Sequence, residues 1–214
     1  MKMTALLLGA SGLTGGYCLQ ELLSNPQFES VIVPLRKPIP ISNPKLIQII
    51  VDFDKLDDYK MQLKADIVFC CLGTTIKKVG TKEKFRQIDL EYPLHFAKIA
   101  KANGAHTYVL VSALGADVKS MFFYSRVKGE LEIELKKLNF PTLIIMQPSL
   151  LLGDRQEKRA GEDFAKTMTL LLNFLTPKKY KAIEAKTVAK TMIKLSLQNL
   201  KGVIVKENDK IKEM

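Results

Sequence analysis

Short apolar runs alternate with helical stretches along this chain, and this rhythm limits the fold more than any other feature of the sequence. The first strand-like runs are at residues 3–8, 30–35, 45–51 and 66–72. A helical stretch at residues 13–23 follows the first of them. Strands that alternate with helices are typical of βαβ units, which build a mostly parallel sheet. The fourth run is apolar almost throughout, which predicts a strand buried on both faces.

The rest of the chain continues this alternation of strands and helices up to residue 147 and then departs from it. Further helices are predicted at residues 82–103 and 121–138, and further strands at residues 107–112 and 142–147. After these come a polar loop at 149–161, helices at 162–175 and 186–197, and an edge strand at 202–205. Because 214 residues suit one domain, we predict a single α/β domain over residues 1–214. Its sheet is doubly wound and mostly parallel, and residues 149–182 form a small C-terminal helical region on the substrate side.

Composition excludes several classes of protein. No apolar run approaches the ~18 residues that a membrane span needs, so we expect no membrane span. The net charge is +11, but the lysines are dispersed at helical spacing, without the basic and aromatic interleaving of a nucleic-acid reader. We therefore expect no specific nucleic-acid partner; attraction of nucleic acid or anionic lipid by this charge is the alternative.

The few cysteines and histidines narrow the chemistry further. The chain has three cysteines, Cys18, Cys70 and Cys71. This odd number argues against a disulfide framework and for a reducing compartment. We therefore expect a cytoplasmic protein. His95 and His106 are the only histidines, and neither has a partner at a metal-ligand spacing. We expect no metal site.

A glycine cluster stands between the first strand and the first helix. Gly9, Gly12 and Gly15 follow each other at intervals of three residues. A tight turn here presents backbone N–H groups and a helix N-terminus to a pyrophosphate, which a Cβ would hold away. An ordinary turn is the alternative, and a P-loop is excluded because no Gly-Lys-Ser/Thr follows. We expect a dinucleotide-binding Rossmann fold.

The end of the second strand indicates which dinucleotide binds. NAD enzymes usually carry an acidic residue there, whereas this chain has Arg36 and Lys37. Cations suit the additional phosphate of NADP(H), which we expect to be preferred over NAD(H); a solvated basic loop is the alternative. Asp52 and Phe53, just past the third strand, are candidates for contacts with the adenine, although a strand-to-loop cap has the same sequence.

The end of the fourth strand is the next place where a cofactor passes, since ligands lie beyond the carboxyl ends of parallel strands. Cys71, Leu72 and Gly73 stand there, and Gly73 permits a close backbone approach. Because side chains alternate along a strand, Cys70 and Cys71 are expected to face opposite sides of the sheet.

A candidate catalytic set follows the fifth strand. Tyr124 and Lys128 are four residues apart on a predicted helix, so they share a face, and Ser112 ends the strand before it. Reduction of a carbonyl by hydride needs a proton donor, which Tyr124 supplies if the Lys128 ammonium makes it a better acid. Lys128 also holds the ribose, and Ser112 orients the substrate oxygen. In the alternative, Tyr124 packs against its aromatic neighbours and Lys128 is solvated.

At these residues the chain resembles the atypical short-chain dehydrogenases, in residues 9–15, in Ser112, Tyr124 and Lys128, and in Pro148 after the sixth strand. Longer segments are similar to the Tat-interacting-protein-like oxidoreductases: VDFDKLDDY at 51–59, FCCLGTT at 69–75, VKGE at 127–130 and DRQE at 154–157. The resemblance implies a Rossmann fold, the Ser-Tyr-Lys set and NADPH binding. The matching cofactor positions are Gly9, Ser11, Gly12, Leu13, Thr14, Arg36, Asp52, Phe53, Leu72 and Gly73.

One departure from the family concerns the substrate side. The family commonly has Arg-Pro-Gly after the sixth strand, where this chain has Gln147, Pro148 and Ser149, so this wall of the substrate pocket is expected to differ. The resemblance also implies a protein partner, because the animal relative is described chiefly as a regulator that binds other proteins.

Three functions are compatible with these residues. The first is an NADPH-dependent oxidoreductase acting on a small carbonyl or quinone-like substrate. The second is an NADP(H)-sensing regulator with little or no turnover, which has no need of the Ser-Tyr-Lys set. The third is a sugar-nucleotide epimerase or dehydratase, which usually needs a larger substrate lobe. The first is our leading hypothesis, for a monomer or homodimer.

Overall fold

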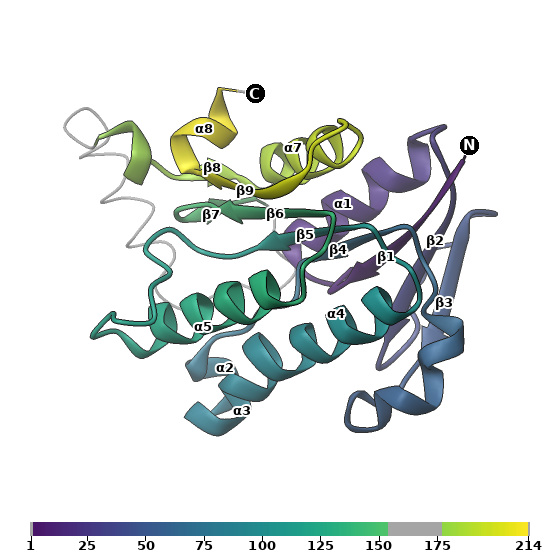
Figure 1. Cartoon of the computed structure of the whole chain (residues 1–214), viewed down its shortest axis with the longest axis horizontal. Coiled ribbons are helices and arrows are strands. Elements are labelled where there is room, and N and C mark those ends of the chain that lie inside the picture. Colours follow the sequence, from purple (N-terminus) through teal and green to yellow (C-terminus); the bar gives the residue numbers. More distant parts are fainter. Residues whose placement is uncertain (1, 154–176, 214) are drawn as a thin grey trace.

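The structure is a computed structural model that describes residues 2–153 and 177–213. Its centre is a seven-stranded sheet in the order β3-β2-β1-β4-β5-β6-β9, in which every neighbouring pair is parallel (Figure 1). The strands are β1 (Met3–Leu8), β2 (Phe28–Leu35), β3 (Leu46–Ile50), β4 (Ile67–Cys70), β5 (Thr107–Val111), β6 (Thr142–Gln147) and β9 (Gly202–Glu207). The predicted parallel sheet is confirmed, and the run at residues 202–205 is an edge strand as predicted.

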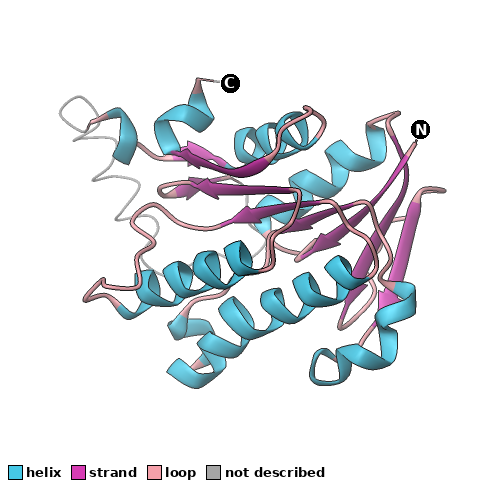
Figure 2. Cartoon of the chain, viewed as in Figure 1, coloured by secondary structure: helices cyan, strands magenta, loops and turns pink. Residues whose placement is uncertain are grey.

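Helices cover both faces of this sheet, as Figures 1 and 2 show. On one face α1 (Leu13–Ser24) packs beside α7 (Ala185–Ser196), and on the other α4 (Tyr92–Ala102) packs beside α5 (Phe123–Lys137). Shorter elements complete the described chain. They are the 3-10 helices Phe53–Gln62 and Lys178–Tyr180, the helices α2 (Ile76–Val79), α3 (Lys82–Arg86) and α8 (Asn208–Lys212), the π-helix Gln87–Glu91, and a small parallel pair of β7 (Leu151–Leu152) and β8 (Ile183–Glu184).

Two hydrophobic layers form because successive strand residues point to opposite faces. Leu6 and Leu8 of β1 belong to the layer under α4 and α5, whereas Ala5 and Leu7 belong to the layer under α1 and α7. Cys70 lies in the first layer and Cys71 packs against the second. The expectation that these two cysteines face opposite sides is therefore confirmed.

The chain reverses its direction of winding at β1, which pairs with β2 on one side and β4 on the other. The order β3-β2-β1-β4-β5-β6 is that of the doubly wound Rossmann fold, in which ligands bind beyond the carboxyl ends of the strands at this switch point. The turn after β1 and the turn after β4 therefore lie side by side at the edge where the sequence predicts a cofactor.

One predicted helix differs from expectation, and another lies outside the described residues. The predicted helix at residues 82–103 contains a π-helical segment at Gln87–Glu91 between α3 and α4; such segments widen a helix locally and are frequent at functional sites. The predicted helix at residues 162–175 lies outside the described residues. Among the residues that are described, no helix has the length and apolarity to cross a membrane.

Candidate functional site

The glycine turn after β1 is shaped by close backbone contacts. Gly9 has a φ of +81°, and a Cβ there would lie 2.7 Å from the Cys71 carbonyl oxygen. A Cβ on Gly15 would lie 2.0 Å from the Gly9 carbonyl oxygen, closer than two atoms can approach. At Gly12, by contrast, the nearest atom to a Cβ is the same oxygen at 3.2 Å. Gly9 and Gly15 are thus required by the fold, whereas a Cβ at Gly12 would be tight and would need only a small shift of the Gly9 carbonyl.

The start of α1 is suited to an anion. Gly12 precedes the helix without a side-chain hydrogen bond to its first turn, and that turn holds no acidic residue. The first N–H groups of a helix carry a partial positive charge and need acceptors from outside the helix. Ser11 and Gly12 are exposed, Leu13 is half-buried and Thr14 is buried. The predicted phosphate loop therefore has accessible backbone at its exposed tip.

The segment after β6 reaches this loop from the other side. Gly153 has a φ of +152°, and a Cβ there would lie 2.9 Å from Leu13 Cδ1 and 3.4 Å from Tyr17. The end of β7 consequently covers the first turn of α1. This contact brings the described beginning of the predicted region 149–182 to the glycine turn.

Arg36 and Lys37 are both exposed after β2. The Arg36 guanidinium lies close enough to Tyr92 to oppose the effects of burial and of Asp54, which together raise the pKa of that phenol. Tyr92 donates a hydrogen bond of 2.6 Å to Asp54. Arg36 thus lies at a polar cluster beside the predicted adenine-side residues.

Asp52 and Phe53 have structural partners of their own. The Asp52 carboxylate accepts a hydrogen bond of 3.0 Å from the Asp54 N–H and caps the 3-10 helix that follows. The Phe53 ring packs at 5.3 Å from Tyr92 and 5.5 Å from Phe96. The cap that the sequence left open as an alternative for Asp52 is present, and the contact of these residues with adenine stays a prediction.

The loop after β4 meets α5 through a buried ion pair. Lys128 Nζ lies 2.7 Å from Asp89 Oδ1, with side-chain exposures of 4% and 0%. The second Asp89 oxygen accepts a hydrogen bond of 2.8 Å from the Thr74 N–H. A Cβ on Gly73 would lie 3.5 Å from Asp89 and 3.8 Å from Lys128 Nζ. The structure therefore brings Gly73 and Lys128 together and adds Asp89 beside both.

Asp89 decides the charge state of Lys128. Burial by itself lowers the pKa of a lysine, but the attraction of the Asp89 carboxylate outweighs it, and the pKa of Lys128 is raised. Lys128 is consequently an ammonium at neutral pH. Because its charge is paired, the field that it exerts on other groups is weaker than a lone lysine would produce.

Tyr124 lies one helical turn before Lys128 at the rim of the site. It is 41% exposed, and its ring centroid is 5.8 Å from that of Phe85. Its electrostatic effect helps to raise the pKa of Lys128, so the two side chains are neighbours. Tyr124 is therefore accessible to a substrate and close to the ammonium.

The Ser112 hydroxyl has a partner within the structure. Ser112 follows β5, is 5% exposed, and its Oγ donates a hydrogen bond of 2.5 Å to Glu132 Oε1 on α5. The Gln147 amide donates to both oxygens of Glu132, at 3.0 and 3.1 Å. The hydrogen of Ser112 is thus used by Glu132, a residue that the sequence analysis did not select.

Pro148, which follows Gln147 in the chain, is buried, and its carbonyl accepts a hydrogen bond of 2.8 Å from the Leu114 N–H.

The adjacent thiols after β4 are poor nucleophiles. Burial raises the pKa of Cys70 to about 11. The neighbouring Cys18 thiol and burial raise the pKa of Cys71 well above its ordinary value. A thiolate is the reactive form of cysteine, so a raised pKa makes both thiols unreactive. Both side chains pack in the core, and the Cys71 backbone lies against Gly9.

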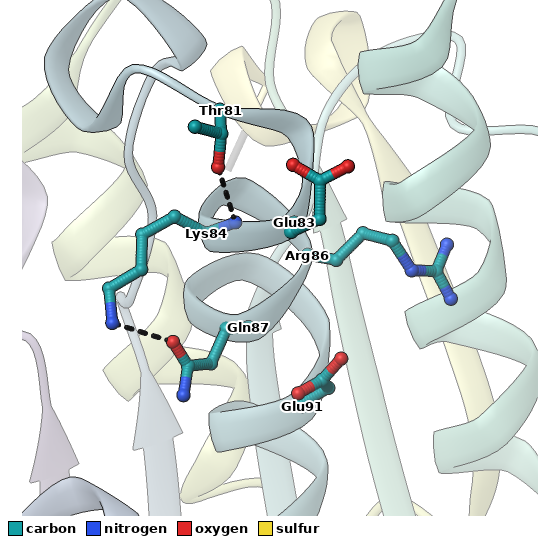
Figure 3. Close-up of a pocket in the computed structure, with 6 residues that line it drawn as sticks. All are labelled: Thr81, Glu83, Lys84, Arg86, Gln87 and Glu91. Atoms are coloured by element: carbon teal, nitrogen blue, oxygen red, sulfur yellow. Dashed lines mark hydrogen bonds between the residues drawn. The ribbon is translucent and has the colours of Figure 1, made fainter.

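A hollow of about 530 Å³ lies on α3 and the π-helix (Figure 3). It is lined by Thr81, Glu83, Lys84, Arg86, Gln87 and Glu91. Several of these side chains bond within the structure: Thr81 accepts from the Lys84 N–H, Lys84 Nζ donates to Gln87, and Arg86 pairs with Glu130. No predicted site residue lines it, so we assign it no role.

Comparison with known proteins decides the family. No family model matches the chain. It is 41% identical to protein HTATIP2 of Rattus norvegicus over 164 residues, which cover 75% of this chain and 67% of that protein. It is 31% identical to the mitochondrial protein FMP52 of Candida albicans over 214 residues, covering 94% and 90%. The chain belongs to the HTATIP2/FMP52 family. The resemblance to Tat-interacting-protein-like oxidoreductases is therefore confirmed.

Solved structures confirm the fold of this HTATIP2/FMP52 family member. MoeE5 in complex with UDP-glucose and NAD has a TM-score of 0.73 at 14% identity, covering 95% of this chain and 76% of that one. The UDP-glucose 4-epimerase of Thermotoga maritima has a TM-score of 0.73 at 15% identity, covering 96% and 77%. At such identities the similarity shows the Rossmann fold alone.

Two residues of the site escaped the sequence analysis although signals for them exist. Asp89 stands four residues after Phe85, on the apolar side of a predicted helix, where an acid is unexpected unless it is paired. Glu132 stands four residues after Lys128, on the same face of α5. The main addition that the structure makes is therefore two buried acidic residues beside the predicted catalytic set: Asp89 contacts Lys128, and Glu132 contacts Ser112.

Proposed function

We propose that this protein is an NADPH-dependent oxidoreductase that acts on a small carbonyl or quinone-like substrate. The observation that carries the proposal is the convergence of the glycine turn, the Gly73 loop and Lys128 at the switch point of the sheet. Family membership and the fold support a protein of this kind, since MoeE5 and WbmG, two solved proteins of the same fold, form complexes with NAD.

The described residues fit a dinucleotide. The exposed tip of the glycine turn and the uncapped start of α1 would hold the pyrophosphate. Lys128, at the Gly73 loop, would hold ribose hydroxyls, and Arg36 and Lys37 would meet the additional phosphate of NADP(H). When bound, the nicotinamide supplies or accepts a hydride. The exposed cations after β2, where an acidic residue is usual for NAD, support the preference for NADP(H).

Tyr124 would transfer the proton in this reaction. Its side chain is 41% exposed, and it stands one helical turn before the Lys128 ammonium on α5. Asp89 keeps Lys128 charged and fixes its position, although it also weakens the field at Tyr124. A positioned acid of this type contributes a factor of about 10²–10⁴ in rate.

One observation favours the regulator as a second candidate. The Ser112 hydroxyl is bonded to Glu132, and a binding protein without turnover has no need of a free hydroxyl at this position. Such a regulator would use the same dinucleotide loop and bind a protein partner according to the redox state of the cofactor.

Location and assembly are further parts of the proposal. Cys18, Cys70 and Cys71 are free thiols in the structure, which supports a reducing compartment, and we propose the cytoplasm. The FMP52 relatives are named as mitochondrial proteins, so fractionation of cells that express the tagged chain tests this point. We also propose that residues 1–214 form one domain, with 149–182 as a small region on the substrate side. We propose a monomer or homodimer, which sedimentation distinguishes.

Replacement of Tyr124 by Phe tests the enzyme against the regulator. The change removes one oxygen and keeps the ring, so NADPH affinity should stay within a few fold while kcat falls by about 100-fold or more. Turnover is followed by nicotinamide absorbance over a panel of ketones, aldehydes and quinones. If no compound consumes NADPH, or if Tyr124→Phe turns over like the parent, the regulator replaces the enzyme.

A further inference from the structure

Ser112, Glu132 and Gln147 form a largely buried polar cluster, and Glu132 lies on α5, the helix that also carries Tyr124. They come from the ends of two adjacent strands and from α5, and Glu132 is 5% exposed. Ser112 Oγ lies 2.5 Å from Glu132 Oε1, and Gln147 Nε2 lies 3.0 and 3.1 Å from the two Glu132 oxygens. The cluster is thus centred on one carboxyl group that receives three contacts.

The direction of each hydrogen bond follows from the groups involved. The nitrogen of a glutamine amide only donates, so both Glu132 oxygens act as acceptors toward Gln147. A carboxylate meets this demand with both oxygens and keeps a lone pair on Oε1 for the Ser112 hydroxyl, which donates its single hydrogen there.

A serine whose hydrogen is already used has only lone pairs left for a ligand. A carbonyl oxygen also has only lone pairs, so this Ser112 cannot donate to it. A substrate hydroxyl, however, can donate to Ser112 Oγ, and the Glu132 charge strengthens that bond. The cluster therefore selects for a hydroxyl donor and not for a bare carbonyl oxygen.

We propose that Glu132 is a positioning residue that makes Ser112 an acceptor, and that the substrate is a hydroxy ketone or hydroxy aldehyde. This inference rests on the proposed oxidoreductase function. Tyr124 contacts the reacting carbonyl oxygen, and Ser112 accepts from the hydroxyl on the neighbouring carbon. The Gln147 amide matters because it holds Glu132 with a neutral donor, in the position where the family commonly has arginine.

Matched ketone pairs test the substrate class. We compare acetoin with butanone and 2-hydroxyacetophenone with acetophenone, as NADPH-dependent kcat/KM. The hydroxy ketone of each pair should be favoured by about 10–100-fold, which is the range expected for one hydrogen bond assisted by a charge. The preference should appear mainly in KM.

Two variants separate positioning from packing. In Glu132→Gln the new amide oxygen accepts from Gln147 and its nitrogen donates to Ser112, which frees the Ser112 hydrogen. The preference for the hydroxy ketone should fall to within about threefold of unity, while kcat/KM for the plain ketone is kept or raised. Glu130→Gln is the matched control on the same helix, since Glu130 pairs with Arg86 at 2.7 Å and is one-third exposed; it should leave the preference unchanged.

An infrared difference spectrum between the parent and Glu132→Gln adds a measurement without substrate. The parent should lose carboxylate bands on this substitution. Loss of a protonated carboxyl band instead, or turnover with equal kcat/KM within each pair, would overturn the inference while the oxidoreductase stands. If no ketone in either pair or in the wider panel consumes NADPH, the proposed function fails and the substrate class fails with it, whatever the infrared result.

Discussion

Replacing Asp89 by Ala should destabilise this protein more than most single substitutions. The change leaves the Lys128 ammonium without its partner at 2.7 Å, in a place where the lysine side chain is only 4% exposed. Removal of one member of a buried ion pair costs about 3–5 kcal/mol. For a domain of this size 1 kcal/mol shifts the melting temperature by roughly 2–4 °C, so we expect a fall of about 6–20 °C.

Thermal and urea unfolding followed by circular dichroism measure this loss. The double variant Asp89→Ala with Lys128→Met should recover at least half of it, because no uncompensated charge stays buried. Glu130→Ala is the control on α5: it breaks the partly exposed pair with Arg86 and should cost less than about 1 kcal/mol. A melting temperature for Asp89→Ala within about 2 °C of the parent, or no recovery in the double variant, would refute this reasoning.

The remaining predictions concern the cofactor loop. Gly12→Val should keep the fold, since the φ of −83° suits any residue and the new Cβ, 3.2 Å from Gly9 O, needs only a small shift of that carbonyl. It should nevertheless weaken NADPH binding at least 100-fold, about 2.7 kcal/mol. Unchanged affinity in a fluorescence titration would mean that the glycines form only a turn. Gly15→Ala, whose Cβ would lie 2.0 Å from Gly9 O, should instead yield little folded protein on expression. Arg36→Ala should remove most of a tenfold or greater preference for NADPH over NADH and leave NADH affinity nearly unchanged; an undiminished preference would exclude a contact between Arg36 and the phosphate.

The fold was largely predictable because its signals are local. Apolar runs and helical periodicity located all seven strands of the main sheet, and the position of the glycine cluster placed the switch point. The opposite facing of Cys70 and Cys71 followed from the alternation of a strand. The π-helical segment at Gln87–Glu91 was not predictable, because it contains Asp89, whose partner Lys128 lies on another helix.

The site was predictable in its positions more than in its bonds. Gly73 and Lys128 meet, as the topology requires for residues at the same edge of a parallel sheet. Ser112 also lies where the sequence places it, but the direction of its hydroxyl depends on Glu132, which is twenty residues away along the chain. Such a choice among hydrogen-bond partners is made by tertiary packing, and no spacing rule in the sequence contains it.

Titration of the purified protein with NADPH, followed by the fluorescence of the reduced nicotinamide, tests the central claim most directly. The account predicts saturable binding of one NADPH per chain, at least tenfold tighter than NADH, that is lost in Gly12→Val. A folded parent protein that binds neither NADPH nor NADH would contradict it.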